Sequence, residues 1–223
     1  MRIKILYKMS SLKIAHYNIF HASQDRLGKI REIIKQINPD ICGLMEVTES
    51  QDSFNNFKND LKLLGYKFSL ADASSRHNIG LLHKNLVEIK SIRKNFKHVV
   101  FQVIIKEGTF KDLVIFFVHL SPSSEKERLK EINQLLAQAK EFNEVIIMGD
   151  FNSLSKHDKY DEDKLLECFQ KLGIEKYGKS RLRFDVINKL GRSGFIDVMK
   201  YLEKPFAFSV PTPFNKDPYH ATK

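Results

Sequence analysis

The segment that decides the fold of this chain is Val145-Ile146-Ile147-Met148-Gly149-Asp150-Phe151-Asn152. Its apolar start is short enough for a buried strand, and Gly149 ends the run. Asp150 and Asn152 follow at once, and a sheet holds such strand-end groups rigidly at the rim of a cleft, where catalytic side chains tend to lie. Gly, Asp and Asn are also ordinary turn residues, so this segment alone is equally consistent with a strand that leaves for solvent.

Three other segments of the chain have the same form, an apolar or alternating run with a polar residue near its end. They are residues 12–19, 40–47 and 113–120, and their polar residues are Asn18, Glu46 and His119. Each of these has an ordinary explanation when taken singly: a turn asparagine, a solvated carboxylate and a core histidine. Their joint occurrence is much rarer by chance. The pattern predicts four strands that carry polar groups at their C-terminal ends.

Helical and strand patterns alternate along the rest of the chain. Apolar spacing predicts helices over Asp25–Gln36 and Ser53–Leu64, and a long helix after an N-cap at Ser123 or Ser124. Between Tyr66 and His119 lie several strand-like runs, and the polar turn 106–109 predicts a hairpin. Strands buried on both faces imply two packed sheets with outer helices, which is an α/β fold.

The residue types at these strand ends are those that metal-assisted cleavage of a phosphoester would use. Such a reaction needs a water nucleophile and relief of the charge on the phosphoryl oxygens, which Mg²⁺ supplies while held by one or two carboxylates. Glu46 is the expected metal ligand, with Asn18 as a neutral oxygen donor. Asp150 is placed to take the proton of the attacking water, and Asn152 to hold that water or a phosphoryl oxygen. His119 is placed to donate a hydrogen bond or proton to the phosphate.

Zinc chemistry is not expected from this sequence. Cys42 and Cys168 do not form a Cys-x-x-Cys pair, and the chain has no His-Glu-x-x-His stretch. Two distant cysteines also suit a reducing compartment rather than a disulfide framework.

The same segments resemble the endonuclease/exonuclease/phosphatase superfamily. The resemblance rests on Tyr17–Ile19, Pro39–Val47, Asn78–Lys84, Val118–Leu120 and Met148–Ser153, of which the Gly-Asp-Phe-Asn motif is the most specific. It implies a four-layer α/β/β/α sandwich, with two packed mixed sheets flanked by helices, over residues 11–223 after an extension at 1–10. It also implies Mg²⁺ or Mn²⁺ as cofactor. The roles that it implies are catalytic for His119, Asp150 and Asn152, metal-binding for Glu46 and Asn18, and substrate-binding for Asn78 and Asn152.

The resemblance fails near the C-terminus. Members of the superfamily end with two strands that carry an Arg-(Ile/Leu)-Asp-Tyr motif and a terminal Ser-Asp-His, and this chain has no Asp-His dipeptide. Residues 210–223 resemble the loop that leads into the first of those strands. We therefore expect that the C-terminal strands are missing and that the chain is a fragment. An alternative to an active enzyme is then a truncated, inactive remnant that at most binds phosphates.

Composition narrows the class of partner. The chain of 223 residues has a formal net charge of +10, which favours polyanions such as nucleic acid, although a lysine-rich composition alone gives the same charge. No apolar run approaches the ~20 residues that span a bilayer, and the apolar stretch at the N-terminus is too short for a signal peptide. We therefore expect a cytoplasmic protein without membrane insertion. The leading hypothesis is a metal-dependent phosphodiesterase or nuclease. A lipid-directed phosphodiesterase has less support, because no helix has a dense basic face. The oligomeric state is left open.

Overall fold

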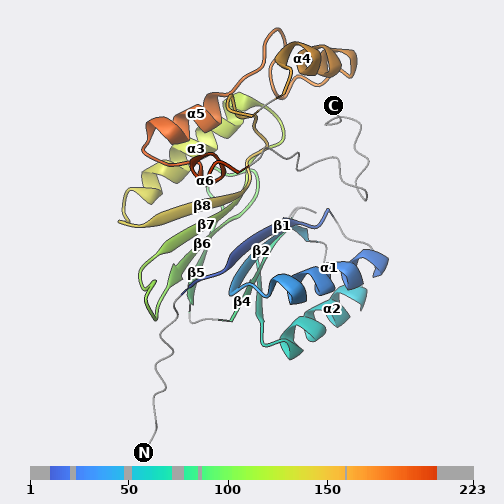
Figure 1. The fold of residues 1–223 in the computed structure, drawn as a ribbon, viewed down its shortest axis with the longest axis vertical. Coiled ribbons are helices and arrows are strands. Elements are labelled where there is room, and N and C mark those ends of the chain that lie inside the picture. Colours follow the sequence, from blue (N-terminus) through green and yellow to red (C-terminus); the bar gives the residue numbers. More distant parts are fainter. Residues whose placement is uncertain are drawn as a thin grey trace, which may run out of the picture. The chain divides into compact units, whose positions relative to one another are not determined.

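The computed structural model describes residues 11–20, 24–47, 52–71, 78–84, 87–158 and 160–204 (Figure 1). These residues fall into two compact units. The first unit runs to Leu120 and also includes Ala139–Phe151, and the second consists of Ser121–Gln138 and the described residues from Asn152 onward. All eight strands found in the described ranges belong to the first unit.

The strands of the first unit form two mixed four-stranded sheets. The first sheet has the order β1-β2-β4-β3, made of Ile14–Asn18, Ile41–Val47, Asn78–His83 and Lys67–Leu70 respectively. The second has the order β5-β6-β7-β8, made of Val87–Ile92, Val100–Ile105, Val114–His119 and Val145–Asp150. In each sheet one strand pair is parallel, β1 with β2 and β7 with β8, and the remaining pairs are antiparallel.

A buried apolar layer joins the two sheets. Alternate residues of each strand point into it, because successive side chains of a strand lie on opposite faces. The first sheet contributes Ile41, Met45, Ile79 and Leu81, and the second contributes Phe101, Val103, Ile115 and Phe117. The sheets approach closely at Gly43, where an added Cβ would lie 2.3 Å from the ring of Phe117. This layer is the main core of the first unit.

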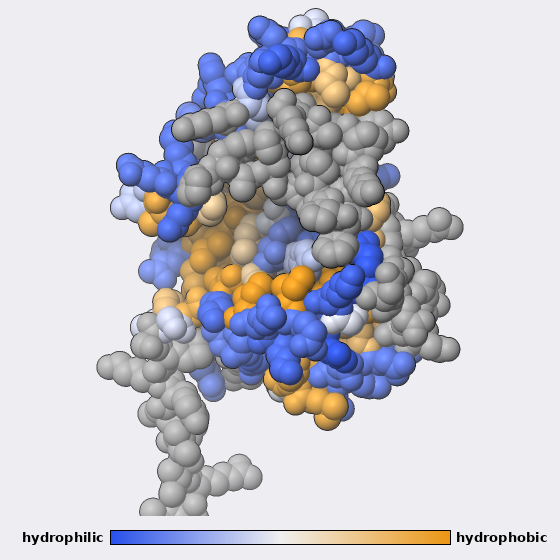
Figure 2. All heavy atoms as spheres, turned by 45° about the vertical axis from the view of Figure 1, so that its right-hand side comes forward, coloured by the Kyte–Doolittle hydropathy of each residue, from blue (hydrophilic) through white to orange (hydrophobic). Residues whose placement is uncertain are grey.

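Two helices cover the other face of the first sheet. Helix α1 (Gln24–Ile37) and helix α2 (Asp52–Leu63) bury apolar side chains against it. The layer includes Leu27, Ile30, Ile34, Phe54, Phe57 and Leu61 from the helices and Cys42, Leu44 and Leu82 from the strands. Their outward faces are mostly polar, with Ile37 and Leu63 as exposed apolar residues, and Figure 2 shows mainly hydrophilic side chains over the part of the surface where α1 and α2 lie.

The second unit is helical. It contains almost all of α3 (Glu125–Ala139), together with α4 (Glu162–Lys171), α5 (Asp185–Arg192) and the short α6 (Val198–Tyr201). Helix α3 begins where Ser124 accepts a hydrogen bond from the Glu127 N–H at 3.2 Å, so Ser124 is the N-cap. A small apolar cluster of Leu165, Phe169, Tyr177 and Leu182 holds α4 to the segment that follows it.

The structure confirms the predicted α/β class, the two mixed sheets and the hairpin, which joins β6 to β7. The expected helices are present, and each end of α1 and α2 differs by one residue from the expected one. Among the described residues no helix is long and apolar enough to cross a membrane.

Candidate active site

Four strands carry polar side chains at their C-terminal ends, where the side chains that face the inter-sheet layer would otherwise be apolar. On β1 the inward series is Ile14, His16, Asn18, and on β8 it is Ile146, Met148, Asp150. On β7 the series Ile115, Phe117, His119 ends in the same way. Because β1 is parallel to β2 and β7 is parallel to β8, the C-terminal ends of each pair lie at one edge of their sheet. The polar side chains at these strand ends therefore form one site.

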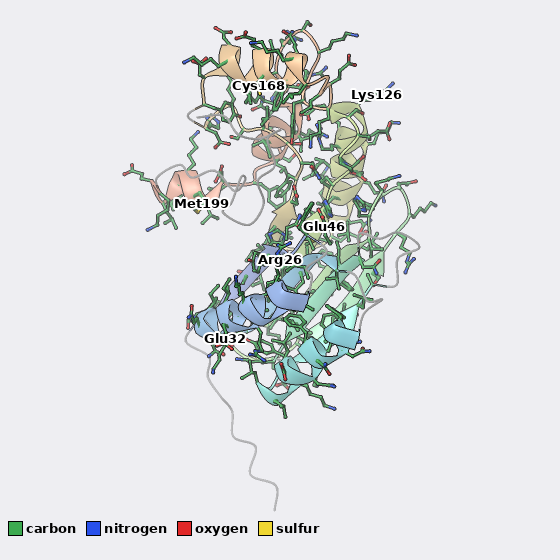
Figure 3. All side chains as sticks on the ribbon, turned by 90° about the vertical axis from the view of Figure 1, so that its right-hand side faces the viewer. Arg26, Glu32, Glu46, Lys126, Cys168 and Met199 are labelled. Carbon is green, nitrogen blue, oxygen red and sulfur yellow. The ribbon has the colours of Figure 1, made fainter. Side chains whose placement is uncertain are left out.

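Glu46 reaches this site through a β-bulge. Leu44 pairs with Gly80 and Val47 with Asn78, so β2 has one residue more than β4 over this interval. Glu46 lies within the bulge with a φ of 56°, in the left-handed region that a residue with a side chain rarely adopts. Bulges redirect side chains at the ends of strands. The carboxylate of Glu46, labelled in Figure 3, thus departs from the regular alternation. It contacts Asn18 of β1.

The four strand-end residues Asn18, Glu46, His119 and Asp150 contact one another, and we call them the strand-end cluster. The amide nitrogen of Asn18 donates to Glu46 Oε1 at 2.9 Å and to Asp150 Oδ2 at 3.4 Å. Nε2 of His119 lies 3.8 Å from Glu46 Oε1 and 3.9 Å from Asp150 Oδ2. Two carboxylates therefore meet at one amide and one imidazole.

The side-chain oxygen of Asn18 has a separate partner. It accepts a hydrogen bond from the Phe20 N–H at 3.0 Å, and this contact directs the amide NH₂ group toward the carboxylates. In this orientation Asn18 positions Glu46 and Asp150. Binding a metal through its oxygen, as the sequence predicts, would require the amide to turn over.

Steric crowding explains why the first residue of the Gly-Asp-Phe-Asn motif is a glycine. Gly149 has a φ of +144°, and an added Cβ would lie 1.9 Å from the carbonyl oxygen of Val118 on the paired strand. The pairing continues from Val118 with Gly149 to His119 with Asp150. A side chain at position 149 would therefore separate the strand ends that bring His119 and Asp150 together.

Two histidines of this region were missed by the sequence reasoning. The ring of His98 stacks on that of His119, with centroids 4.4 Å apart and an interplanar angle of 18°. His16 lies on the same face of β1 as Asn18, and its Nε2 is buried without a hydrogen bond from the described residues. Burial lowers the pKa of His16 to about 4; Asp150 opposes this shift and His119 adds to it. The two-residue spacing from Asn18 was the available signal for His16.

The remaining predicted site residues are the two asparagines. Asn78 begins β4 opposite Val47, next to the bulge, and its buried side-chain oxygen accepts no hydrogen bond from the described residues. Such an acceptor is costly unless a donor satisfies it. Asn152 begins the second stretch of the second unit and has a φ of 47°. Its predicted role stays a prediction.

The donor set of the strand-end cluster suits a hard divalent cation. The oxygens of Glu46 and Asp150 meet at the Asn18 amide, and Mg²⁺ binds through one or two carboxylates with waters in its remaining positions. Within the described ranges, no group of three or more His, Cys, Asp and Glu side chains is arranged to hold a metal ion. Glu46 is better placed than Asp150 to be the metal ligand, because the bulge directs its carboxylate into the site and its side chain is mostly buried.

Solved structures with the same fold include a phosphatase, an endonuclease and a protein in complex with single-stranded DNA. They include ANGEL2, described as a 2',3'-cyclic phosphatase, which is 19% identical with a TM-score of 0.52, and the match covers 65% of this chain and 54% of that one. D. rerio TDP2 in complex with a single-stranded DNA product is 21% identical, with a TM-score of 0.53 and coverages of 66% and 62%. An AP endonuclease from Archaeoglobus fulgidus is 16% identical, with a TM-score of 0.54 and coverages of 70% and 63%.

The matched part of this chain thus spans less than two thirds of each of these three proteins. A comparison with curated proteins gave no match. The model of the Endonuclease/Exonuclease/phosphatase family matches residues 15–192, which include every residue of the strand-end cluster. The chain belongs to the Endonuclease/Exonuclease/phosphatase family.

Proposed function

We propose that this protein is a metal-dependent phosphodiesterase or nuclease that hydrolyses nucleic acid or another phosphoester. The observation that carries the proposal is the convergence of the Glu46 and Asp150 carboxylates on the Asn18 amide and the His119 imidazole, at the ends of four strands. Family membership supports hydrolysis of a phosphoester, and the contacts suggest which residue does what.

Asp150 is the proposed general base. Its carboxylate Oδ2 contacts both the Asn18 amide and the edge of His119, so it is held in one orientation. Its side chain is about one-third exposed, with a relative accessibility of 34%, which leaves room for a water molecule to approach. A positioned carboxylate accepts the proton of the attacking water as the new bond to phosphorus forms.

His119 and the asparagines are proposed to hold the substrate. His119 presents Nε2 toward the two carboxylates and would donate a hydrogen bond or a proton to a phosphate oxygen. Asn78, which begins β4 next to the bulge, is proposed to bind the substrate. Asn152, two residues beyond Asp150, is proposed to hold the attacking water or a phosphoryl oxygen.

Mg²⁺ or Mn²⁺ is the proposed cofactor, with Glu46 as its ligand. When bound, such an ion neutralises negative charge on the phosphoryl oxygens. Asn18 would keep the Glu46 and Asp150 carboxylates at their separation through its two hydrogen bonds. The net charge of +10 supports a polyanionic substrate, because a positive field attracts phosphodiesters and raises their rate of association.

The test is a hydrolysis panel with the full chain. Its substrates are abasic DNA, single-stranded DNA, sphingomyelin and inositol phosphates, each with Mg²⁺, Mn²⁺ or EDTA. We expect metal-dependent cleavage of a nucleic acid that EDTA abolishes. Cleavage of sphingomyelin alone would point to a lipid-directed phosphodiesterase instead.

Two variants separate the site from contaminating activity. Asp150→Asn should abolish most of the cleavage, whereas Asp163→Asn, on the exposed surface of α4, should leave it unchanged. If no substrate is cleaved with either metal while single-stranded DNA still binds, the protein is a phosphate-binding remnant and the proposal is wrong.

A further inference from the structure

The contact between His98 and His119 suggests a role for a residue outside the strand-end cluster. His98 precedes β6, the antiparallel neighbour of β7, and Phe101 pairs with Phe117. Continuing that register places residue 99 opposite His119. His98 therefore lies just before the first residue of β6, near the C-terminal end of β7.

The stack buries both rings almost completely. His98 is 4% exposed and His119 is 5% exposed, and their planes differ by only 18° at a centroid distance of 4.4 Å. Aromatic rings at such distances attract each other, and a flat contact resists rotation of either ring. His98 thus contacts the face of His119, while the carboxylates of Glu46 and Asp150 lie near its Nε2 edge.

The orientation of a histidine ring at a strand end depends on contacts with the ring itself. The χ2 torsion of histidine has broad minima, so the backbone alone does not orient the imidazole. The distances from Nε2 to the two carboxylates, 3.8 and 3.9 Å, are longer than hydrogen bonds and hold the ring only weakly. The face contact with His98 resists rotation of the His119 ring in addition to these two contacts.

We propose that His98 is a positioning residue that holds the imidazole of His119 edge-on to Glu46 and Asp150 by stacking on its face. The catalytic part of this inference rests on the proposed function, in which His119 contacts the phosphate. The role requires a planar ring at position 98 and does not require a nitrogen there. This requirement separates it from a hydrogen-bonding or ligand role for His98.

Three variants at position 98 test the requirement. His98→Phe keeps a planar ring, His98→Leu keeps apolar volume without one, and His98→Ala removes both. We expect His98→Phe to retain kcat within about threefold, and His98→Leu and His98→Ala to lose about 10–100-fold in kcat with KM nearly unchanged, the scale seen when a supporting contact is lost. His157→Ala, an exposed histidine of the second unit, is the matched control and should have no effect.

A second measurement does not depend on catalysis. In NMR spectra of protein labelled at histidine, the His119 resonances, assigned with His119→Asn, should form one sharp set in wild type and in His98→Phe. In His98→Leu and His98→Ala they should split or broaden, while thermal midpoints report whether each variant is folded. If wild type cleaves nothing but the spectra behave in this way, the proposed function fails and the positioning role stands.

Two results would overturn the inference. One is a His119 signal that stays single and unshifted in both His98→Leu and His98→Ala. The other is a loss of kcat in His98→Phe as large as in His98→Ala, which would mean that a nitrogen of His98 is what matters.

Discussion

Two clusters of charged side chains lie in the two units of this protein, and their charges are satisfied in different ways. In the strand-end cluster of the first unit, the amide of Asn18 and the imidazole of His119 contact two carboxylates. In the second unit, a fully buried guanidinium, Arg128, pairs with the buried carboxylate of Glu125 at 2.9 Å.

The Arg128 cluster, made of Ser121, Glu125, Arg128 and Glu131, is a satisfied network. Arg128 donates from Nε and Nη2 to Glu125 and from Nη1 to the Ser121 carbonyl, and its Nη2 also reaches the Lys176 carbonyl. The other oxygen of Glu125 accepts from the Val186 N–H at 3.0 Å, and Glu131 accepts from the Ser121 N–H at 2.7 Å. The network joins the start of α3 to the start of α5.

The comparison separates a structural use of charge from a functional one. A buried ion pair with all its hydrogen bonds made holds elements together, and it costs most when one partner is removed. Two carboxylates that meet at a neutral amide destabilise each other, because like charges repel. Such an arrangement is expected where a divalent cation binds between the carboxylates. The two clusters therefore predict different effects of mutation. A substitution in the strand-end cluster should lower activity and not stability, and a substitution in the Arg128 cluster should lower stability.

The largest effect expected is on catalysis at Asp150. Asp150→Asn removes the proposed general base and should lower the hydrolysis rate by about 10²–10⁴-fold, the usual contribution of such a group. Because the substitution also removes one of two like charges, the thermal midpoint should not fall. Steady-state kinetics and thermal denaturation of the same preparation check both parts. An active Asp150→Asn enzyme would mean that another group activates the water.

The next effect concerns stability at Arg128. Arg128→Ala leaves Glu125 buried without its cation and should lower the free energy of unfolding by about 3–5 kcal/mol, measured by urea denaturation. Lys164→Ala is the control, because Lys164 forms an exposed pair with Asp161 at 3.2 Å whose loss should leave the free energy of unfolding nearly unchanged. Equal losses in the two variants would show that the Arg128 cluster is not structural.

The strand-end residues could be predicted because their signals are local. Alternation along 12–19 and the apolar run before Gly149 identify the strands, and Asn18, Glu46, His119 and Asp150 stand where those runs end. A strand end is a position in the sequence, so a sequence pattern reports it. The N-cap of α3 was narrowed to two serines for the same reason, and the hydrogen bond from Glu127 selects Ser124.

What could not be predicted depends on pairing between distant segments. The bulge at Glu46 exists only because β2 pairs with β4 across a shifted register, and nothing in residues 40–47 reveals it. His98 meets His119 because β6 and β7 are neighbours, which makes a histidine before one strand a partner of a histidine ending the other. Both features follow from the register between strands, which local periodicity does not encode.

Acid should weaken the first unit through His16. Its pKa is about 4 in the folded protein against 6.5 for an unperturbed histidine, mainly because of burial. Between these values the unfolded chain binds a proton that the folded protein does not, so stability falls as the pH decreases from 6.5 to 4 and changes no further below that. The loss attributable to His16 is about 3 kcal/mol at most.

The measurement is the free energy of unfolding as a function of pH, in EDTA, for wild type and His16→Asn. Carboxylates titrate in both proteins, so the difference between the two curves isolates His16. The difference should grow over the interval from pH 6.5 to 4. Parallel curves would mean that His16 binds protons equally in the folded and unfolded states.

The smallest effect expected is on metal affinity at Glu46. Glu46→Gln keeps the size of the side chain and can still accept from the Asn18 amide through its remaining oxygen, but it removes the charge that a divalent cation requires. Affinity for Mn²⁺, measured by calorimetric titration, should fall about tenfold or more, since even the loss of a group that only supports a ligand costs 10–100-fold. Glu107→Gln, at an exposed turn, is the control and should bind Mn²⁺ like wild type. The thermal midpoint without metal should stay level or rise, because the variant no longer places two carboxylates at one amide. A fall in the midpoint together with unchanged Mn²⁺ affinity would place Glu46 with Arg128 among the structural charges, and the difference between the two clusters would disappear.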